Sequence, residues 1–146
     1  VTQTTLSVDE CRDIVAALNR RFPGIKGPHQ EDICYATQNR QNAVKALSKL
    51  VDLILVIGSP NSSNSMRLVE VAQRAGAASR LIARGADIAP EWLDGVDTLG
   101  ITAGASAPEE LVREVVDRLA SLRPVVEEEI VTAGETVTFK LPAQLA

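Results

Sequence analysis

Residues 53–58 read Leu-Ile-Leu-Val-Ile-Gly, an unbroken apolar run that ends at a glycine. A run this short is typical of a strand that is buried on both faces of a parallel sheet. Apolar residues recur at helical spacing before it, over residues 39–51, and another helix is expected from about residue 65 to 76. Strands are predicted at 80–83 and 98–102. This alternation predicts an α/β fold, a small and mostly parallel sheet with helices on both faces.

The N-terminal part of the chain is predicted to form one helix, over about residues 8–21. Ser7 and Glu10 make a capping-box pattern before it. Its apolar residues recur on one face, at Cys11, Ile14, Val15, Leu18 and Phe22. Two Pro/Gly pairs then break the chain. We therefore predict a domain boundary near residue 30, which makes residues 1–30 a separate unit.

The last part of the chain is predicted to contain a helix and then a tail. Ser106 and Glu109 form a second capping-box pattern before the helix, which a proline closes. Residues 137–141 alternate between apolar and polar side chains, which predicts a half-buried edge strand. Residues 31–124 are thus predicted to be the main α/β unit, and residues 125–146 a C-terminal tail.

The composition excludes several classes of function. The chain has 146 residues and a net charge of -4, which argues against nucleic acid as a partner because phosphate binding needs concentrated Lys and Arg. No apolar stretch approaches the roughly 20 residues that span a bilayer, so we expect no membrane association and a cytoplasmic location. The first residue is Val1, just before an apparent strand end, which predicts that the chain is part of a longer protein.

Hydroxyl and amide side chains cluster where the predicted strands end. Residues 58–65 read Gly-Ser-Pro-Asn-Ser-Ser-Asn-Ser, residues 102–106 read Thr-Ala-Gly-Ala-Ser, and residues 2–7 read Thr-Gln-Thr-Thr-Leu-Ser. The carboxyl ends of parallel strands meet at one edge, where ligands bind. Helix N-termini at that edge favour an anion, so a phosphate or diphosphate is the expected ligand. The chain has neither GxxxxGK[ST] nor GxGxxG, which disfavours the familiar nucleotide sites.

Each of these residues also has a plainer interpretation. Ser, Thr and Asn often begin helices only as caps, although a cap needs one side chain and residues 62–65 supply four. Cys34 precedes a helix, where the field of the N-terminus would favour a metal-ligating thiolate, but a lone cysteine is more often an inert buried residue. Cys11 is interpreted as a core residue and His29 as a solvated one. Neither cysteine lies in a recognised metal-binding spacing.

Four motifs in order, at residues 2–7, 32–37, 61–65 and 102–108, make the chain similar to the LytB family of iron-sulfur reductases. The resemblance implies a three-lobed protein with a central [4Fe-4S] cluster that is held by one cysteine from each lobe. It implies reductive removal of a hydroxyl group from 4-hydroxy-3-methylbut-2-enyl diphosphate, which gives isopentenyl and dimethylallyl diphosphate, the last step of the methylerythritol phosphate pathway. Ferredoxin or flavodoxin is the implied electron donor.

The resemblance also implies roles for individual residues. Cys34 corresponds to one of the three cluster ligands, and Thr4 to a catalytic residue that hydrogen-bonds near the substrate hydroxyl. The other implied substrate-binding residues are Ser62, Ser63, Asn64, Ser106, Gln3 and Thr37. Residues 1–30 would end the central lobe, and residues 31–124 would form the third lobe. Two cluster cysteines would then belong to an N-terminal half that this chain lacks, so we expect the chain to be inactive alone.

Two competing hypotheses stay open on the sequence. The chain could be a stand-alone phosphate-binding α/β module without a cluster, in which Cys34 is structural. It could also be a structural α/β domain whose serines are ordinary helix caps. Substitution of Cys34 distinguishes the phosphate-binding module from the reductase, because only the reductase would lose its cluster and activity. Joint substitution of Ser62 and Asn64 tests the structural domain, for which ligand affinity should not change.

Overall fold

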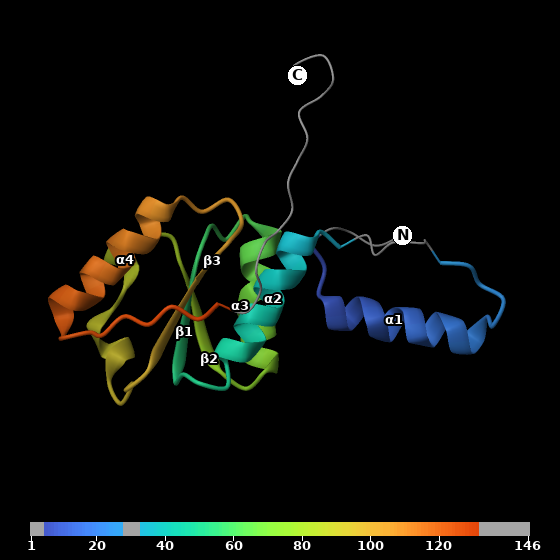
Figure 1. The fold of residues 1–146 in the computed structure, drawn as a ribbon, viewed down its shortest axis with the longest axis horizontal. Helices are drawn as coiled ribbons and strands as arrows, with labels where there is room; N and C mark the ends of the chain where they lie inside the picture. The colour runs from blue at the N-terminus through green and yellow to red at the C-terminus, as the bar shows by residue number, and fades with distance from the viewer. Residues whose placement is uncertain (1–4, 28–32, 132–146) are drawn as a thin grey trace, which may run out of the picture.

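A parallel sheet of three strands forms the centre of the protein in the computed structural model, which describes residues 5–27 and 33–131 (Figure 1). The strands are β1 (Leu53–Ile57), β2 (Ala78–Ile82) and β3 (Leu99–Ala103), in the order β2-β1-β3. β1 pairs in parallel with both neighbours, with Leu53 opposite Ala78 and Leu99. The buried apolar run is therefore the central strand, as predicted.

Helices cover both faces of this sheet (Figure 1). Ile54 and Val56 pack with α2 (Tyr35–Leu47) and α3 (Ser63–Arg74) on one face. On the other face, Leu55 and its neighbours on β1 pack with α4 (Glu109–Leu122) and with the 3-10 turn Pro90–Leu93. A second 3-10 turn, Gly85–Asp87, contacts α4. Burial on both sides explains why every residue of β1 is apolar. The predicted α/β layering is confirmed.

The first helix, α1 (Val8–Arg21), starts beside α2 and extends away from the sheet (Figure 1). Ser7 caps it, because the Glu10 backbone N–H donates to Ser7 Oγ at 3.4 Å. The capping box is only half made, since the Glu10 carboxylate accepts from Arg67 and Arg74 of α3. Of the predicted apolar face only Cys11 is buried. The other members are 40–57% exposed: Ile14, Val15, Leu18 and Phe22.

The start of α4 differs from the sequence prediction. Pro108 is the N-cap, with extended backbone at φ -63° and ψ 147°, and no side chain caps the helix. Ser106 lies earlier, in a turn that the Ala107 N–H closes on the Gly104 carbonyl at 3.0 Å. The predicted capping role of Ser106 is therefore wrong, because the proline already directs the chain into the helix. This leaves the Ser106 hydroxyl exposed on the loop.

Several sequence predictions fall outside the described residues. The edge strand expected at 137–141, the Gln3-Thr4 segment and His29 all lie there. The boundaries proposed near residues 30 and 124 stay predictions. None of the helices in the described parts of the chain is long and apolar enough to cross a membrane.

The Asp52 carboxylate fastens the start of β1 to the start of β3. It accepts hydrogen bonds from the Thr98 N–H at 2.8 Å, from Thr98 Oγ1 at 2.9 Å and from the Asp97 N–H at 3.1 Å. The Asp52 N–H in turn donates to the Thr98 carbonyl at 2.9 Å. The hydrogen bond from the Thr98 backbone is the main reason that the pKa of Asp52 lies below its ordinary value.

We predict that Asp52→Ala lowers the melting temperature near neutral pH. A carboxyl whose folded-state pKa is depressed stabilises the fold above its unfolded pKa of about 3.9. That contribution fades below this pH and is lost as the pH falls through the folded-state pKa. The difference in melting temperature between parent and variant should therefore narrow below about pH 4. Asp13→Ala, at an exposed position of α1, is the charge-matched control. A difference that stays constant with pH, or one that the control reproduces, would contradict the assignment.

Candidate functional site

Two loops leave the sheet side by side at its carboxyl edge. Ile57 and Ala103 are paired at the ends of β1 and β3, and the Gly104 N–H continues the ladder by donating to the Ile57 carbonyl at 2.9 Å. The loop after β1 leads into α3, and the loop after β3 leads into α4. Both helices therefore begin at this edge (Figure 1). We call residues 58–65 and 104–108, which make up these two loops and the first turn of α3, the carboxyl rim.

Ser65 holds the centre of the carboxyl rim. Its side chain is fully enclosed, and its Oγ donates to Ser62 Oγ at 3.1 Å. A Cβ built on Gly58 would lie 2.1 Å from Ser65 Oγ, and one built on Gly104 would lie 2.5 Å from it. Only glycine fits at either strand end, because the Ser65 hydroxyl occupies the space that a side chain would need. The family resemblance implies no role for Ser65, although its place three residues after the Ser62 cap is a signal for one.

The Ser62 hydroxyl is oriented by two hydrogen bonds that it accepts. One comes from Ser65 Oγ and the other from the Ser65 backbone N–H at 3.3 Å. A hydroxyl oxygen has two acceptor lone pairs and one hydrogen. With both lone pairs used, the hydrogen of Ser62 remains to be donated to another group. The predicted binding residue Ser62 is therefore also the cap of α3, so the two interpretations of the sequence are compatible.

Asn64 has an unused amide in the first turn of α3. Its Oδ1 and Nδ2 atoms are both shielded from solvent, and neither has a hydrogen-bond partner among the described residues. A buried polar group without a partner costs about 1–3 kcal/mol. Ser63 and Ser106 are exposed on the same rim. The rim thus offers neutral hydrogen-bonding groups near two helix starts, an arrangement that suits an anion.

The start of α2 lies at the same edge of the sheet. α2 has 13 residues, about 20 Å of helix, and only residues 48–52 connect its end to the start of β1. It must therefore run antiparallel to β1, which brings its first turn to the carboxyl edge beside α3 (Figure 1). Cys34 is the N-cap of α2. Thr37, which the family resemblance implies to be a substrate-binding residue, is buried in the first turn.

The Cys34 side chain is suited to serve as a metal ligand. It is exposed and makes no capping hydrogen bond, so its sulfur is not committed to the fold. Within residues 5–27 and 33–131, no group of three or more Cys, His, Asp or Glu side chains could hold a metal ion. Cys34 can therefore contribute one ligand to a site whose other ligands come from outside the described residues. Gln3 and Thr4 also lie outside them.

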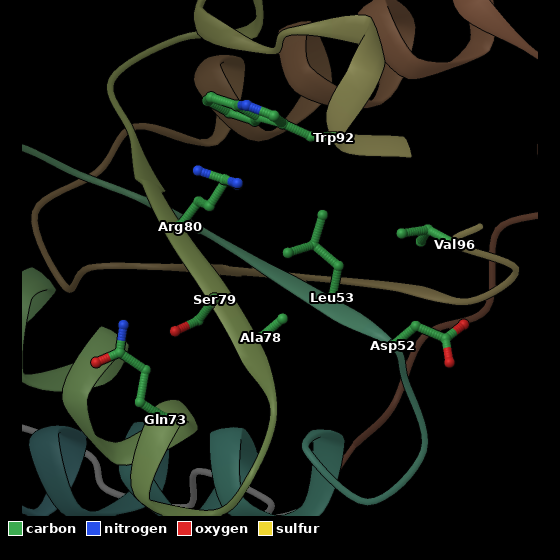
Figure 2. Close-up of a pocket in the computed structure, with 8 residues that line it drawn as sticks. All are labelled: Asp52, Leu53, Gln73, Ala78, Ser79, Arg80, Trp92 and Val96. Atoms are coloured by element: carbon green, nitrogen blue, oxygen red, sulfur yellow. The ribbon is translucent and has the colours of Figure 1, made fainter. Parts of the chain in front are cut away.

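A cavity of about 410 Å³ lies at the opposite edge of the sheet (Figure 2). It is lined by the first residues of β1 and β2 together with Asp52, Arg80 and Trp92. Its two charged groups already make contacts within the fold. The Arg80 guanidinium stacks 4.4 Å from the centre of the Trp92 ring, and Asp52 is bonded to residues 97 and 98. The available polar groups and the helix starts favour the carboxyl rim over this cavity as the anion site.

The fold and the rim define the class of the protein: an open parallel α/β protein whose loops and helix starts converge at the carboxyl edge of the sheet. The sequence model of the family described as "LytB protein" matches residues 1–120. The chain belongs to the LytB family, which confirms the resemblance that the four motifs carry.

Relatives of known name agree with this assignment. The 4-hydroxy-3-methylbut-2-enyl diphosphate reductase of Hyphomonas neptunium is 60% identical over 147 residues, a match that covers 100% of this chain and 47% of that protein. Reductase 2 of the same name from Bradyrhizobium diazoefficiens is 56% identical over 146 residues, with the same coverage of each chain. The chain thus spans about half the length of the curated relatives it matches.

A solved structure shows the same fold. It is that of the E-1-hydroxy-2-methyl-but-2-enyl-4-diphosphate reductase from Plasmodium falciparum, which is 33% identical and superimposes with a TM-score of 0.89. The match covers 99% of this chain and 46% of that one. The superposition therefore covers the described sheet and its helices.

We predict that Gly104→Ala destabilises the fold by about 1–3 kcal/mol, the usual cost of overpacking, and that Ser65→Ala suppresses much of this effect. Removal of Ser65 Oγ leaves Ser65 Cβ 3.7 Å from the new methyl group, an ordinary contact. Gly58→Ala is the matched control, because the added Cβ would still lie 2.6 Å from Ser65 Cβ. A double-mutant cycle by urea unfolding measures both couplings. Equal rescue at the two glycines, or none at Gly104, would contradict the packing described.

Proposed function

We propose that this chain supplies the diphosphate-binding rim and one cluster cysteine of a LytB reductase. The reaction proposed is the reductive removal of the hydroxyl group of 4-hydroxy-3-methylbut-2-enyl diphosphate, with isopentenyl and dimethylallyl diphosphate as products. Membership of the family supports the reaction. The single structural observation that carries the proposal is the Asn64 amide, which has no hydrogen-bond partner among the described residues and lies in the first turn of α3, the helix that Ser62 caps.

The rim binds the diphosphate mainly through neutral donors in this proposal. Ser62 Oγ accepts two hydrogen bonds, which leaves its hydrogen for the ligand, and Asn64 Nδ2 has no acceptor among the described residues. Ser63 and Ser106 add two exposed hydroxyls. Arg67 is not assigned to the diphosphate, because it already pairs with Glu10 at 2.8 Å and with Glu70. Backbone N–H groups at the starts of α3 and α4 add a favourable field.

Cys34 supplies one ligand of the [4Fe-4S] cluster in this proposal. Such a cluster, when bound with one iron open, supplies a Lewis acid for the substrate hydroxyl and a route for electrons. The chain's own residues fix the geometry around it. The start of α2 places Cys34 at the same edge as the rim. Thr4, Gln3 and Thr37 are proposed to lie near the reacting end of the substrate, with Thr4 hydrogen-bonded to its hydroxyl.

The exposed apolar face of α1 supports the proposal that another part of a LytB protein packs against this helix. Ile14, Val15, Leu18 and Phe22 present a continuous apolar stripe on a helix that is anchored to the described body at its first turn. Exposed stripes of this kind are typical of surfaces that pack against a partner. We propose that the part of the LytB proteins which this chain does not span covers the stripe. Reduced ferredoxin or flavodoxin is the proposed electron donor, and the cytoplasm the proposed location.

We predict that Cys34→Ser and the double variant Ser62→Ala/Asn64→Ala have different effects in a full-length LytB protein that contains this sequence. Cys34→Ser removes a cluster ligand, so iron content and turnover should both fall. The double variant removes diphosphate donors and should keep the cluster while KM rises by about 10- to 100-fold, as expected for the loss of one or two hydrogen bonds to a charged group. Iron analysis, the electron paramagnetic resonance spectrum and steady-state kinetics measure these effects.

Other outcomes favour the competing hypotheses. Unchanged iron content, activity and pyrophosphate affinity in Cys34→Ser would support a phosphate-binding module in which this cysteine is structural. A double variant that loses stability but keeps its KM would show that Ser62 and Asn64 serve only the start of α3. Ser121→Ala, at an exposed position of α4 on another part of the surface, is the matched control.

A further inference from the structure

The Ser65 hydroxyl is a polar group that the fold encloses. Ser65 is 1% exposed and lies in the first turn of α3. Its Oγ fills the space beside the backbone of Gly58 and Gly104, so that no side chain fits at either position. The ends of β1 and β3 therefore fix where this hydroxyl lies.

This enclosure determines which of two serines is the donor. Ser65 Oγ lies 3.1 Å from Ser62 Oγ, and among the described residues it has no other hydrogen-bond partner. If Ser62 donated, the hydrogen of Ser65 would be enclosed without an acceptor, which is costly for a buried polar group. Ser65 is therefore the donor and Ser62 the acceptor.

Ser62 is left with one hydrogen-bonding function. Its Oγ also accepts from the Ser65 N–H at 3.3 Å, so both of its lone pairs are used. Only the hydrogen remains for a ligand. Such a group binds an oxygen atom with free lone pairs, as in an ionised phosphate, and offers no acceptor to a ligand O–H.

The bond from Ser65 Oγ also makes Ser62 a stronger donor. A hydroxyl that accepts a hydrogen bond is polarised, and consecutive hydrogen bonds reinforce one another. The chain of bonds runs from the Ser65 hydroxyl through the Ser62 hydroxyl to the ligand. Without Ser65 Oγ, the Ser65 N–H would still hold Ser62 as the cap of α3, but one lone pair would be open and the Ser62 hydroxyl could turn.

We propose that Ser65 is a positioning residue for the diphosphate, which it does not touch: by donating to Ser62 Oγ, it commits the Ser62 hydrogen to a phosphate oxygen. This inference rests on the proposed function, in which Ser62 binds the diphosphate. The hydroxyl group that the reaction removes is at the other end of the substrate. Loss of the Ser65 hydroxyl should therefore raise KM and leave kcat unchanged.

The test compares Ser65→Ala with Ser79→Ala in a cluster-loaded, full-length LytB protein that contains this sequence. Ser65→Ala should raise KM and weaken the binding of inorganic pyrophosphate by about 3- to 10-fold, with kcat and iron content as in the parent. Ser79→Ala is the matched control. Ser79 Oγ donates to the Val69 carbonyl of the same helix at 3.2 Å, but Ser79 lies near the start of β2, at the opposite edge of the sheet. This control should leave KM unchanged. Steady-state kinetics and isothermal titration calorimetry measure these values.

A double-mutant cycle with Ser62→Ala tests whether Ser65 acts through Ser62. If it does, Ser65→Ala should raise KM in the parent and have no further effect in the Ser62→Ala background. The variant Ser65→Ala/Gly104→Ala separates the hydrogen bond from packing. Its added methyl group refills the space of the lost hydroxyl but cannot donate, so stability should recover while KM stays raised. This variant takes the place of Ser65→Ala if the single variant does not fold.

The proposal is wrong if Ser65→Ala keeps the KM of the parent, or if it raises KM equally in the parent and in the Ser62→Ala background. It is also wrong if the methyl group at Gly104 restores the KM, because packing is then the cause, or if Ser79→Ala raises KM as much. Failure of the proposed function gives a different pattern. Ser62→Ala would then keep the pyrophosphate affinity of the parent, which overturns the diphosphate site itself and the role of Ser65 with it.

Discussion

The Ser65 hydroxyl lies against the backbone of Gly58 and Gly104, at the ends of two paired strands, and this close approach determines where α3 can begin. This contact needs the ends of β1 and β3 to lie side by side, as the pairing of Ile57 with Ala103 places them. β1 is fully buried between two layers of helices, which favours a single register. The contact also directs the Ser65 hydroxyl to Ser62, whose own hydrogen is thereby left for a ligand. One buried hydroxyl thus connects the packing of the sheet to the chemistry of the rim.

This arrangement explains how a rim with few available cations can suit an anion. The first turns of α2, α3 and α4 meet at the edge where β1 and β3 end. Partial positive charge at helix starts then takes the place of arginine, and Arg67 and Arg74 of α3 are engaged with Glu10. The same edge presents the exposed Cys34 thiol. The rim lies within the described residues, whereas any metal bound by Cys34 would need its other ligands from outside them.

Local patterns in the sequence predicted much of the fold. The apolar run of β1 and the family motifs around Cys34 and Ser62 are short-range signals, and the structure and the comparisons confirm the strand and the family. Whether a helix face is buried depends on residues far away in the sequence. The spacing of Leu18 and Phe22 therefore predicts the helix correctly but not that its apolar face is exposed. The role of Ser65 is not predicted for the same reason, because it depends on glycines in neighbouring loops and such contacts leave no periodic pattern in the sequence. The Ser106–Glu109 spacing predicts a capping box, but α4 begins after Pro108, so Ser106 lies too early in the chain to cap it.

The central claim is that the carboxyl rim is the diphosphate site. The most direct test is a crystal structure of a full-length LytB protein that contains this sequence, with bound inorganic pyrophosphate. Our account predicts pyrophosphate oxygens within hydrogen-bonding distance of Ser62 Oγ and of the Asn64 amide, in front of the first turn of α3. Pyrophosphate bound instead in the cavity between Arg80 and Asp52, with the rim occupied only by water, would contradict it.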